Sequence, residues 1–158
     1  MSDKKKALFD SLVKKVEGIV SGGEIEPYER LRSVCKLLKE EVAHYNWVGF
    51  YIVDKKNKNE LFLGPYEGEP TVHTRIPFGK GICGQAAAVE KPFLVQDVSQ
   101  ETNYLACSMK TKSEVVLPIF KGGEFVAELD IDSHMKNAFD DLDLDFLKRV
   151  CDIVSALF

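Results

Sequence analysis

Two features of this sequence could do chemistry: a cysteine in a polar segment and a run of alternating carboxylates. Cys107 lies in "YLACSMKTKSEVVLP", just ahead of a strand-like run that opens with Glu114. A free cysteine usually behaves as a small buried hydrophobe. A thiol in a polar, lysine-bearing loop therefore calls for a chemical explanation.

The carboxylates occupy "AELDID", residues 127–132, in which polar and apolar side chains alternate. In a strand this alternation places Glu128, Asp130 and Asp132 on one face. Such a face is as often the solvated outer side of an antiparallel sheet as a site. The neighbouring hairpin strand begins with Glu114, however, and closely placed carboxylates repel, so that one of them should have a raised pKa and hold a proton. The others would then receive an ammonium group, and the cluster could both bind an amino acid and supply an acid.

A second cysteine, Cys83, lies in "GKGICG", which matches the G-x-G-x-x-G dinucleotide fingerprint literally, with Asp97 further along. The context does not fit, because Pro77 interrupts the approach, the following helix is only about two turns long and no second βαβ unit follows. We expect these glycines to let the backbone turn tightly and to present Cys83 at a helix N-terminus. The helix dipole and free N–H groups there favour a thiolate.

The stretch "NWVGFY" contains the single tryptophan of the chain. Alternation puts Trp47, Gly49 and Tyr51 on one face, opposite Val48 and Phe50. Aromatic residues in a strand usually belong to a core. Tyr and Trp together on the less hydrophobic face would also suit a pocket for a small apolar or sulfur-bearing group.

The remaining candidates favour structural roles. Cys35 and Cys151 fall on the apolar sides of predicted helices, and no CxxC pair is present among the four cysteines, so neither a zinc site nor a disulfide framework is indicated. A Ser/His/Asp hydrolase is not supported, since there is no nucleophile elbow, and spacing nominates no histidine as a base for Cys107. The histidines are His44, His73 and His134.

Bulk properties limit the class of protein. The 158 residues carry a formal net charge of −4 and suit one domain spanning 1–158. The pI near 5.4, without a basic stripe, argues against nucleic acid as a partner. No apolar run is long enough for a membrane span, and no signal peptide is visible. We therefore expect a cytoplasmic protein whose thiols are kept reduced.

The predicted elements define an α+β fold. Helical spacing covers 5–23, with Gly22 and Gly23 as a stop, then 27–45, a short helix at 83–90 and a last helix in 139–158 with Asp140 as N-cap. Period-two patterns predict strands at 47–53, 60–64, 71–77, 92–98, 114–120 and 124–132. We expect a central, mostly antiparallel sheet with helices packed on one face and a loop-covered ligand pocket on the other.

With these pieces assembled, the chain resembles the free methionine-(R)-sulfoxide reductases, which are built on a single GAF domain. The segments that carry the resemblance are "NWVGFY", "LGPYEGEP", "RIPFGKGICG", "ACSMKTKSEVVLP" and "LDIDS". They span residues 46–133, and the flanking helices also fit. Other GAF domains share the fold but not this set of cysteines and carboxylates.

The resemblance implies roles for individual residues. It makes Cys107 the catalytic cysteine and Cys83 a second redox cysteine, with Glu114, Asp130 and Asp132 as the acids that bind substrate and Asp132 also as a catalytic group. It makes Trp47 and Tyr51 the aromatic wall. The family's well-known members have a further cysteine two residues before the arginine of "RIP", where this chain has His73.

The resemblance also implies a mechanism. The Cys107 thiolate would attack the sulfoxide sulfur while a protonated acid receives the oxygen, which leaves a sulfenic acid. Cys83 would condense with it to a disulfide that an external thiol reductant, thioredoxin, opens. We expect no cofactor and no metal ion. We expect the protein to form a homodimer. The alternative is a non-enzymatic GAF module that senses a small ligand.

Overall fold

The fold is built on a six-stranded antiparallel sheet with the strand order β3-β2-β1-β6-β5-β4. The computed structural model describes residues 2–105 and 108–158. Its strands are β1 (Trp47–Val53), β2 (Glu60–Glu67), β3 (Arg75–Pro77), β4 (Phe93–Val95), β5 (Ser113–Lys121) and β6 (Glu124–Ser133). The long strands β1, β6 and β5 are neighbours in the middle of the sheet, so both of its faces can be covered there.

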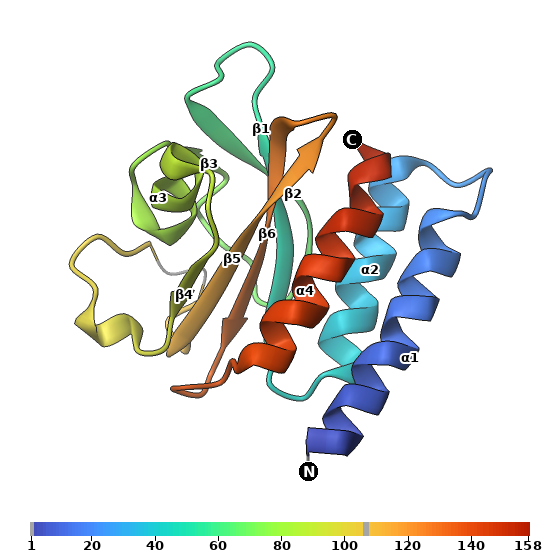
Figure 1. Ribbon diagram of the computed structural model, residues 1–158. Helices are drawn as coiled ribbons and strands as arrows, with labels where there is room; N and C mark the ends of the chain where they lie inside the picture. Colours follow the sequence, from blue (N-terminus) through green and yellow to red (C-terminus); the bar gives the residue numbers. More distant parts are fainter. Residues whose placement is uncertain (1, 106–107) are drawn as a thin grey trace.

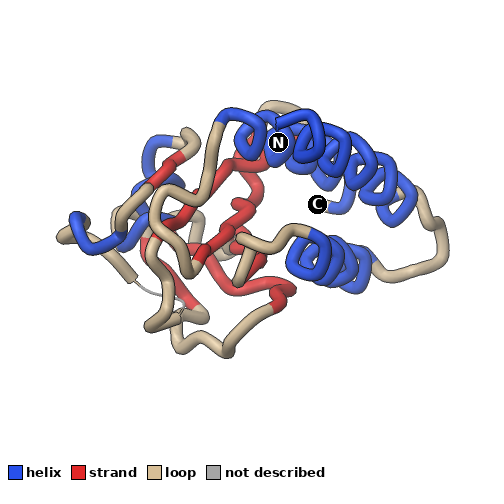
Figure 2. Tube along the Cα trace, turned by 90° about the horizontal axis from the view of Figure 1, so that it is seen from below, coloured by secondary structure: helices blue, strands red, loops and turns tan. Residues whose placement is uncertain are grey.

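Helices cover the two faces unequally. The longer ones, α1 (Ser2–Val20), α2 (Pro27–Glu41) and α4 (Asp141–Val154), lie together on one side, where α2 packs on β1 and β2 and α4 packs on β5 (Figure 1). The short helix α3 (Gly81–Val89) packs on β3, β5 and β6 from the other side, which we call the α3 face. A view from below shows the layer of long helices on one side of the strands (Figure 2). Two 3₁₀ turns complete the fold, η1 (Val98–Gln100) and η2 (Ser155–Leu157).

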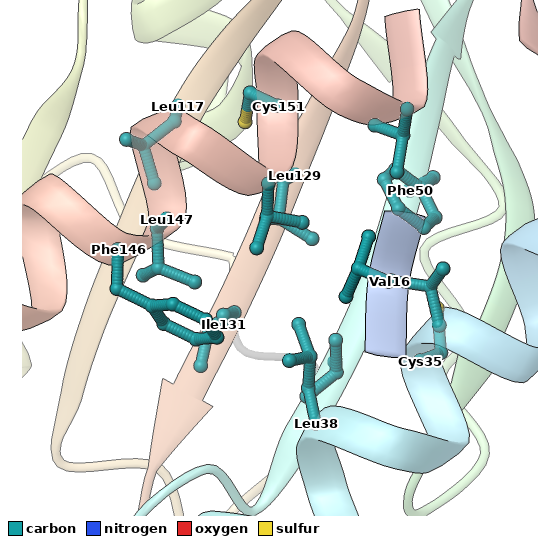
Figure 3. Close-up of a cluster of buried hydrophobic side chains, with 14 of the residues drawn as sticks. Val16, Cys35, Leu38, Phe50, Leu117, Leu129, Ile131, Phe146, Leu147 and Cys151 are labelled. Carbon is teal, nitrogen blue, oxygen red and sulfur yellow. The ribbon is translucent and has the colours of Figure 1, made fainter. Parts of the chain in front are cut away.

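The main hydrophobic core lies between the sheet and the long helices. Apolar residues of alternate strand positions, such as Phe50, Leu117, Leu129 and Ile131, meet side chains of the helices there (Figure 3). Cys35 and Cys151 belong to this core, and burial raises the pKa of both thiols well above the ordinary value. These two cysteines are therefore structural, as the sequence indicates.

A polar network fixes the start of α4 beneath α1. The Asp140 side chain accepts from the backbone N–H of Asp143 at 3.1 Å, and Asp143 accepts in return from Asp140, which forms a capping box. The fully buried Asp143 carboxylate also accepts from Lys5 at 2.6 Å, His44 at 2.7 Å and Tyr45 at 2.8 Å. Burial alone would favour its neutral form, but the hydrogen bonds from His44, the Asp140 backbone and Lys5 outweigh it and hold the pKa of Asp143 well below its usual range.

The predicted α+β fold class is confirmed, with corrections to several boundaries. The strand expected at 71–77 is formed only at 75–77, and the one expected at 92–98 only at 93–95, because each pairs on one side only at an edge of the sheet. Helix α2 ends at Glu41 rather than at 45. Helices are not confined to one face, since α3 covers the other. The tight turn between β5 and β6 is present, with Gly122 and Gly123 at φ of 59° and 79°.

Candidate active site

The candidate site is a block of side chains on the α3 face of the three central strands. Strand register aligns residues of β1, β6 and β5 into three cross-strand rows. The rows are Trp47–Asp132–Glu114, Gly49–Asp130–Val116 and Tyr51–Glu128–Pro118. Six of the seven predicted site residues, Trp47, Tyr51, Cys83, Glu114, Asp130 and Asp132, are buried on this side of the sheet.

Four carboxyl groups in these rows form what we call the acidic cluster: Glu114, Glu128, Asp130 and Asp132. All four are almost fully buried, with at most 2% of the surface of any one exposed. A solvated outer face, the alternative that the sequence left open, is therefore wrong. Packing of α3 and the loops over the strands, rather than the strand pattern, removes these acids from water.

Burial changes the protonation of the cluster. Desolvation, followed by the charges of Asp130 and Asp132, raises the pKa of Glu114 well above its ordinary value. Desolvation and the charge of Asp130 do the same to the pKa of Glu128. Both shifts favour the protonated form of the carboxyl group, in agreement with the expectation that one of several crowded carboxylates holds a proton more tightly.

Cys83 reaches the cluster from the first turn of α3. Gly79 and Gly81 adopt positive φ angles of 94° and 63° before it, and a side chain at Gly84 would approach the Pro77 carbonyl oxygen to 2.6 Å. The glycines thus allow α3 to start next to β3, as the sequence predicted, with no dinucleotide fold around it. The Cys83 thiol lies 3.9 Å from Glu114 Oε2.

An aromatic wall borders the cluster on the β1 side. The rings of Trp47 and Tyr51 stack with centroids 6.3 Å apart, and Tyr66 stacks on Trp47 at 5.3 Å. Trp47 Nε1 donates to the carbonyl of Glu69 at 3.0 Å, and the Tyr51 hydroxyl donates to the carbonyl of His73 at 2.8 Å. Both polar tips are thus turned to the segment between β2 and β3, and the ring faces remain to line the site.

Cys107 lies outside the described residues, but residues close to it on both sides have defined contacts. Before it, Asn103 Oδ1 accepts from the Gly81 N–H at 2.9 Å. After it, Ser108 donates to Glu69 at 2.8 Å and Thr111 donates to Asp132 at 3.4 Å. Asn103 is thus attached to the start of α3, and Thr111 to the acidic cluster.

Sequence reasoning missed some of these contacts. Glu69, Ser108 and Thr111 carry no pattern that marks them, since their partners lie 21 or more residues away in the chain. Alternation places Glu128 on the polar face with Asp130 and Asp132, but it was not among the predicted site residues. Lys110, in the same polar segment as Cys107, has an ammonium group that pairs with Glu69 at 3.2 Å.

The donor set would also allow a metal ion to be held. Cys83 Sγ and one carboxylate oxygen each from Glu114 and Asp130 all lie within 4.8 Å of one another. A cluster of acids is equally what an ammonium group needs, and the aromatic wall beside it suits an organic ligand better than an ion.

Surface clefts lie elsewhere. One of about 1090 Å³ is bordered by the ends of β1, β2 and β6, the start of α2 and the C-terminus, and contains none of the predicted site residues. A smaller one of about 450 Å³ is lined by residues next to the aromatic wall, including Asn46, Glu69 and His134. We place the chemistry at the buried acids rather than in the larger cleft, because only the former combine a thiol with titratable groups.

The fold and the site define the class of the protein. The GAF domain family model matches residues 26–157. A GAF domain-containing protein A from Dictyostelium discoideum is 40% identical over 92% of this chain and 89% of its own length. The free methionine-R-sulfoxide reductase of Saccharomyces cerevisiae is 32% identical over 96% of this chain and 86% of its own.

A solved structure gives the same relationship in three dimensions. The free methionine-R-sulfoxide reductase of Neisseria meningitidis, in complex with its substrate, superimposes with a TM-score of 0.89 at 36% identity and covers 98% of this chain and 90% of its own. The chain therefore belongs to the GAF domain family and, within it, to the group that contains the free methionine-R-sulfoxide reductases. In the described part of the chain, no helix combines the length and apolarity needed to cross a membrane.

Proposed function

We propose that this protein is a thiol-dependent reductase that converts free L-methionine (R)-S-oxide to L-methionine. Relatives that carry this name match it over most of its length. The observation in the structure that carries the proposal is the meeting of a cysteine with buried acids: Cys83, Glu114 and Asp130 place donor atoms within 4.8 Å of one another, beside an aromatic wall. A sensor module would need the ligand pocket but not the cysteines.

The substrate's ammonium group would bind to the acids. Glu114, Asp130 and Asp132 lie on adjacent strands and are nearly inaccessible to water, so a cation that enters among them exchanges its hydration for carboxylate oxygens. The thioether-like end of the side chain would pack on Trp47 and Tyr51, whose faces are apolar and polarisable. This arrangement favours a free amino acid over a methionine sulfoxide within a peptide, which has no ammonium group.

The reduction would take place at Cys107. Its thiolate attacks the sulfoxide sulfur, and a carboxylic acid of the cluster gives its proton to the oxygen. The oxygen is then transferred to Cys107, which becomes a sulfenic acid. The substrate sulfur is thereby reduced by two electrons and Cys107 is oxidised by two. We assign the acid role to Asp132, which lies directly across from Glu114, shares the proton of that carboxyl and receives a hydrogen bond from Thr111, four residues after Cys107.

Cys83 would resolve the sulfenic acid. Its thiol attacks Cys107, a Cys83–Cys107 disulfide forms and water leaves with the oxygen. Where the well-known relatives have another cysteine this chain has His73, and Cys35 and Cys151 lie in the core on the opposite face of the sheet. Of these three cysteines, only Cys83 lies on the α3 face, so we assign the resolving role to it.

Regeneration would come from outside the protein. A dithiol such as thioredoxin supplies two electrons to open the disulfide, and no bound cofactor takes part. We further propose that the protein works as a homodimer in the cytoplasm, where thiol reductants keep it active.

The experiment that tests the activity is an assay of racemic free methionine sulfoxide with dithiothreitol, in which the two diastereomers are separated after the reaction. We expect the (R)-S-oxide to be consumed and the (S)-S-oxide to remain. Cys107→Ser should be folded and inactive, whereas the matched control Cys35→Ser should keep its turnover. Binding of methionine sulfoxide without consumption by the unmutated protein would favour the sensor module instead.

A further inference from the structure

Glu128 is the member of the acidic cluster to which the proposed mechanism gives no role. It lies on β6 two residues before Asp130 and four before Asp132. Strand register puts it directly across from Tyr51 on β1 and Pro118 on β5. Its side chain is fully buried, and neither carboxyl oxygen has a hydrogen-bond partner among the described residues. A buried carboxyl group loses its hydration, so one without a partner in the chain points to a partner that comes from outside it.

The protonation of Glu128 decides what that partner can be. Desolvation, followed by the charge of Asp130, raises the pKa of Glu128 well above its ordinary value and favours the protonated form. A protonated carboxyl group carries one O–H donor, and such a donor makes its strongest hydrogen bond to an ionised acceptor. A carboxylate group on a ligand therefore suits Glu128 better than a second cation does.

Other partners for a ligand carboxylate are engaged or exposed. In the described part of the chain, no lysine, arginine or histidine side chain is buried. The hydroxyl of Tyr51, in the same row as Glu128, donates to the carbonyl of His73, and Trp47 Nε1 donates to that of Glu69. The aromatic wall thus directs both of these hydrogens away from the ligand, and the O–H of Glu128 is left to meet a buried anion in this row.

The spacing of the rows fits a free amino acid bound in the direction that the mechanism requires. The proposed proton transfer places the sulfoxide oxygen at Asp132, and Glu128 lies about 13 Å from it along the same face of β6. In methionine sulfoxide six bonds join a carboxylate oxygen to the sulfoxide oxygen, which gives about 7.5 Å in an extended chain. A hydrogen bond of about 2.7 Å at each end extends this reach to about 13 Å. The ammonium group, on the carbon next to the carboxylate, then lies in the row between, near Asp130.

We propose that Glu128 is a specificity-determining residue whose carboxyl O–H donates a hydrogen bond to the α-carboxylate of the substrate. This inference rests on the proposed function and adds to it the group that recognises the second charged end of the amino acid. The other three acids receive the ammonium group, and Glu128 receives the carboxylate. An amine that lacks the carboxylate leaves the buried Glu128 carboxyl without a partner, so the site discriminates against it.

Binding measurements without turnover test the proposal. In a Cys107→Ser background, calorimetry gives the dissociation constants of (R)-methionine sulfoxide and of 3-(methylsulfinyl)propan-1-amine, which is the same compound without its carboxylate. We expect the amino acid to bind more tightly than the amine. Glu128→Leu should reduce this preference by about tenfold, as expected for the loss of one hydrogen bond to a charged group. Glu128→Gln, which keeps an N–H donor, should preserve it within about threefold. Glu124→Gln, which changes an exposed glutamate on the same strand, is the matched control.

The outcomes separate this inference from the function on which it rests. An unchanged preference in folded Glu128→Leu, or equal binding of the two compounds by the Cys107→Ser parent, would overturn the inference alone. A parent that binds neither compound would overturn the proposed function and the inference with it. If Glu128→Leu does not fold, infrared difference spectra decide. The amino acid, but not the amine, should shift a carboxylic acid C=O band that Glu128→Gln lacks, and the absence of that shift would contradict the proposal.

Discussion

Substitution of Gly49 by alanine should displace the aromatic wall and thereby affect both stability and substrate binding. Gly49 lies in the middle row of the site, opposite Asp130, where its missing side chain leaves room for the Trp47 ring. A Cβ at this position would lie 2.5 and 2.6 Å from two carbons of that ring and 2.8 Å from Tyr66 Cβ. Since carbon atoms pack optimally at about 3.5–4.0 Å, the ring must retreat by roughly 1 Å.

The structure offers little room for this movement. Trp47 is 1% exposed, stacks on Tyr66 and is held by its hydrogen bond to Glu69. Overpacking of this kind costs about 2 kcal/mol of unfolding free energy, which lowers Tm by about 4–8 °C for a chain of this size. A misplacement of about 1 Å in a substrate-binding group lowers kcat/KM by about tenfold to a hundredfold.

Trp47 reports on the change directly, because it is the single tryptophan of the chain. Urea unfolding followed by its fluorescence gives the loss of stability, and the native-state emission gives the displacement of the ring. Gly23→Ala is the matched control, since a Cβ there meets nothing within 4 Å and its φ is not positive. Wild-type stability, emission and kcat/KM in Gly49→Ala would refute the close packing from which the prediction is derived.

Further predictions concern the cysteines, the substrate and the helix network. Cys83→Ser should release one methionine per chain and then stall with thioredoxin as the reductant. In the unmutated protein, peptide mapping by mass spectrometry after one turnover should find the Cys83–Cys107 disulfide. A disulfide between Cys107 and Cys151 instead would show that Cys83 is structural. Cys151→Ala should keep its activity but unfold at lower urea concentration, by about 1–2 kcal/mol, because it leaves a gap in the core. N-acetyl-methionine sulfoxide should not be reduced, since it has no ammonium group for the acids, and a rate comparable with that of the free amino acid would contradict the proposed binding mode. Asp143→Asn should lower the unfolding free energy by about 2–3 kcal/mol at pH 7, measured by urea titration. Since the folded-state pKa of Asp143 is depressed, the stability that its carboxylate contributes is present above the ordinary pKa of 3.8 and is lost as the pH falls below it. The unfolding free energies of Asp143→Asn and of the unmutated protein should therefore converge in acid. A difference between them that does not depend on pH would contradict this.

Much of the fold can be predicted from local patterns. The period-two pattern of 47–53 predicts β1 with its bounds, and the two glycines after Lys121 predict the hairpin that joins β5 to β6. Asp140 acts as the N-cap of α4, as expected from its position before the helix. These features depend on neighbours within a few residues, which is the range over which dihedral preferences and capping hydrogen bonds act.

Strand edges and helix ends were predicted less well. The segment 71–74 has the composition of a strand, yet the sheet pairs only Arg75–Pro77 with β2. Whether a residue joins a ladder depends on a partner strand at the right distance, and composition does not contain this information. The same reason explains the shorter β4 and the longer β2.

For the candidate site, the sequence alone determined which side chains share a face. Alternation along β6 and β1 separates Asp130, Asp132 and Trp47 from the residues of the main core, and the structure has them in that arrangement. Only the tertiary structure decided that the acids on this face are inaccessible to water. The strand pattern is the same whether its polar side meets water or α3, and burial of the acids depends on elements that fold over them from elsewhere in the chain.

Tertiary structure also decided which of these groups touch. Cys83 and Glu114 are 31 residues apart in the chain, and their side chains come within 3.9 Å because α3 packs across β5. The raised pKa values of Glu114 and Glu128 follow from that packing, since desolvation is their largest cause. Residue types and alternation thus determine which functional groups the strands present on this face. The layer that excludes water from these groups determines which of the carboxyl groups favour the protonated form.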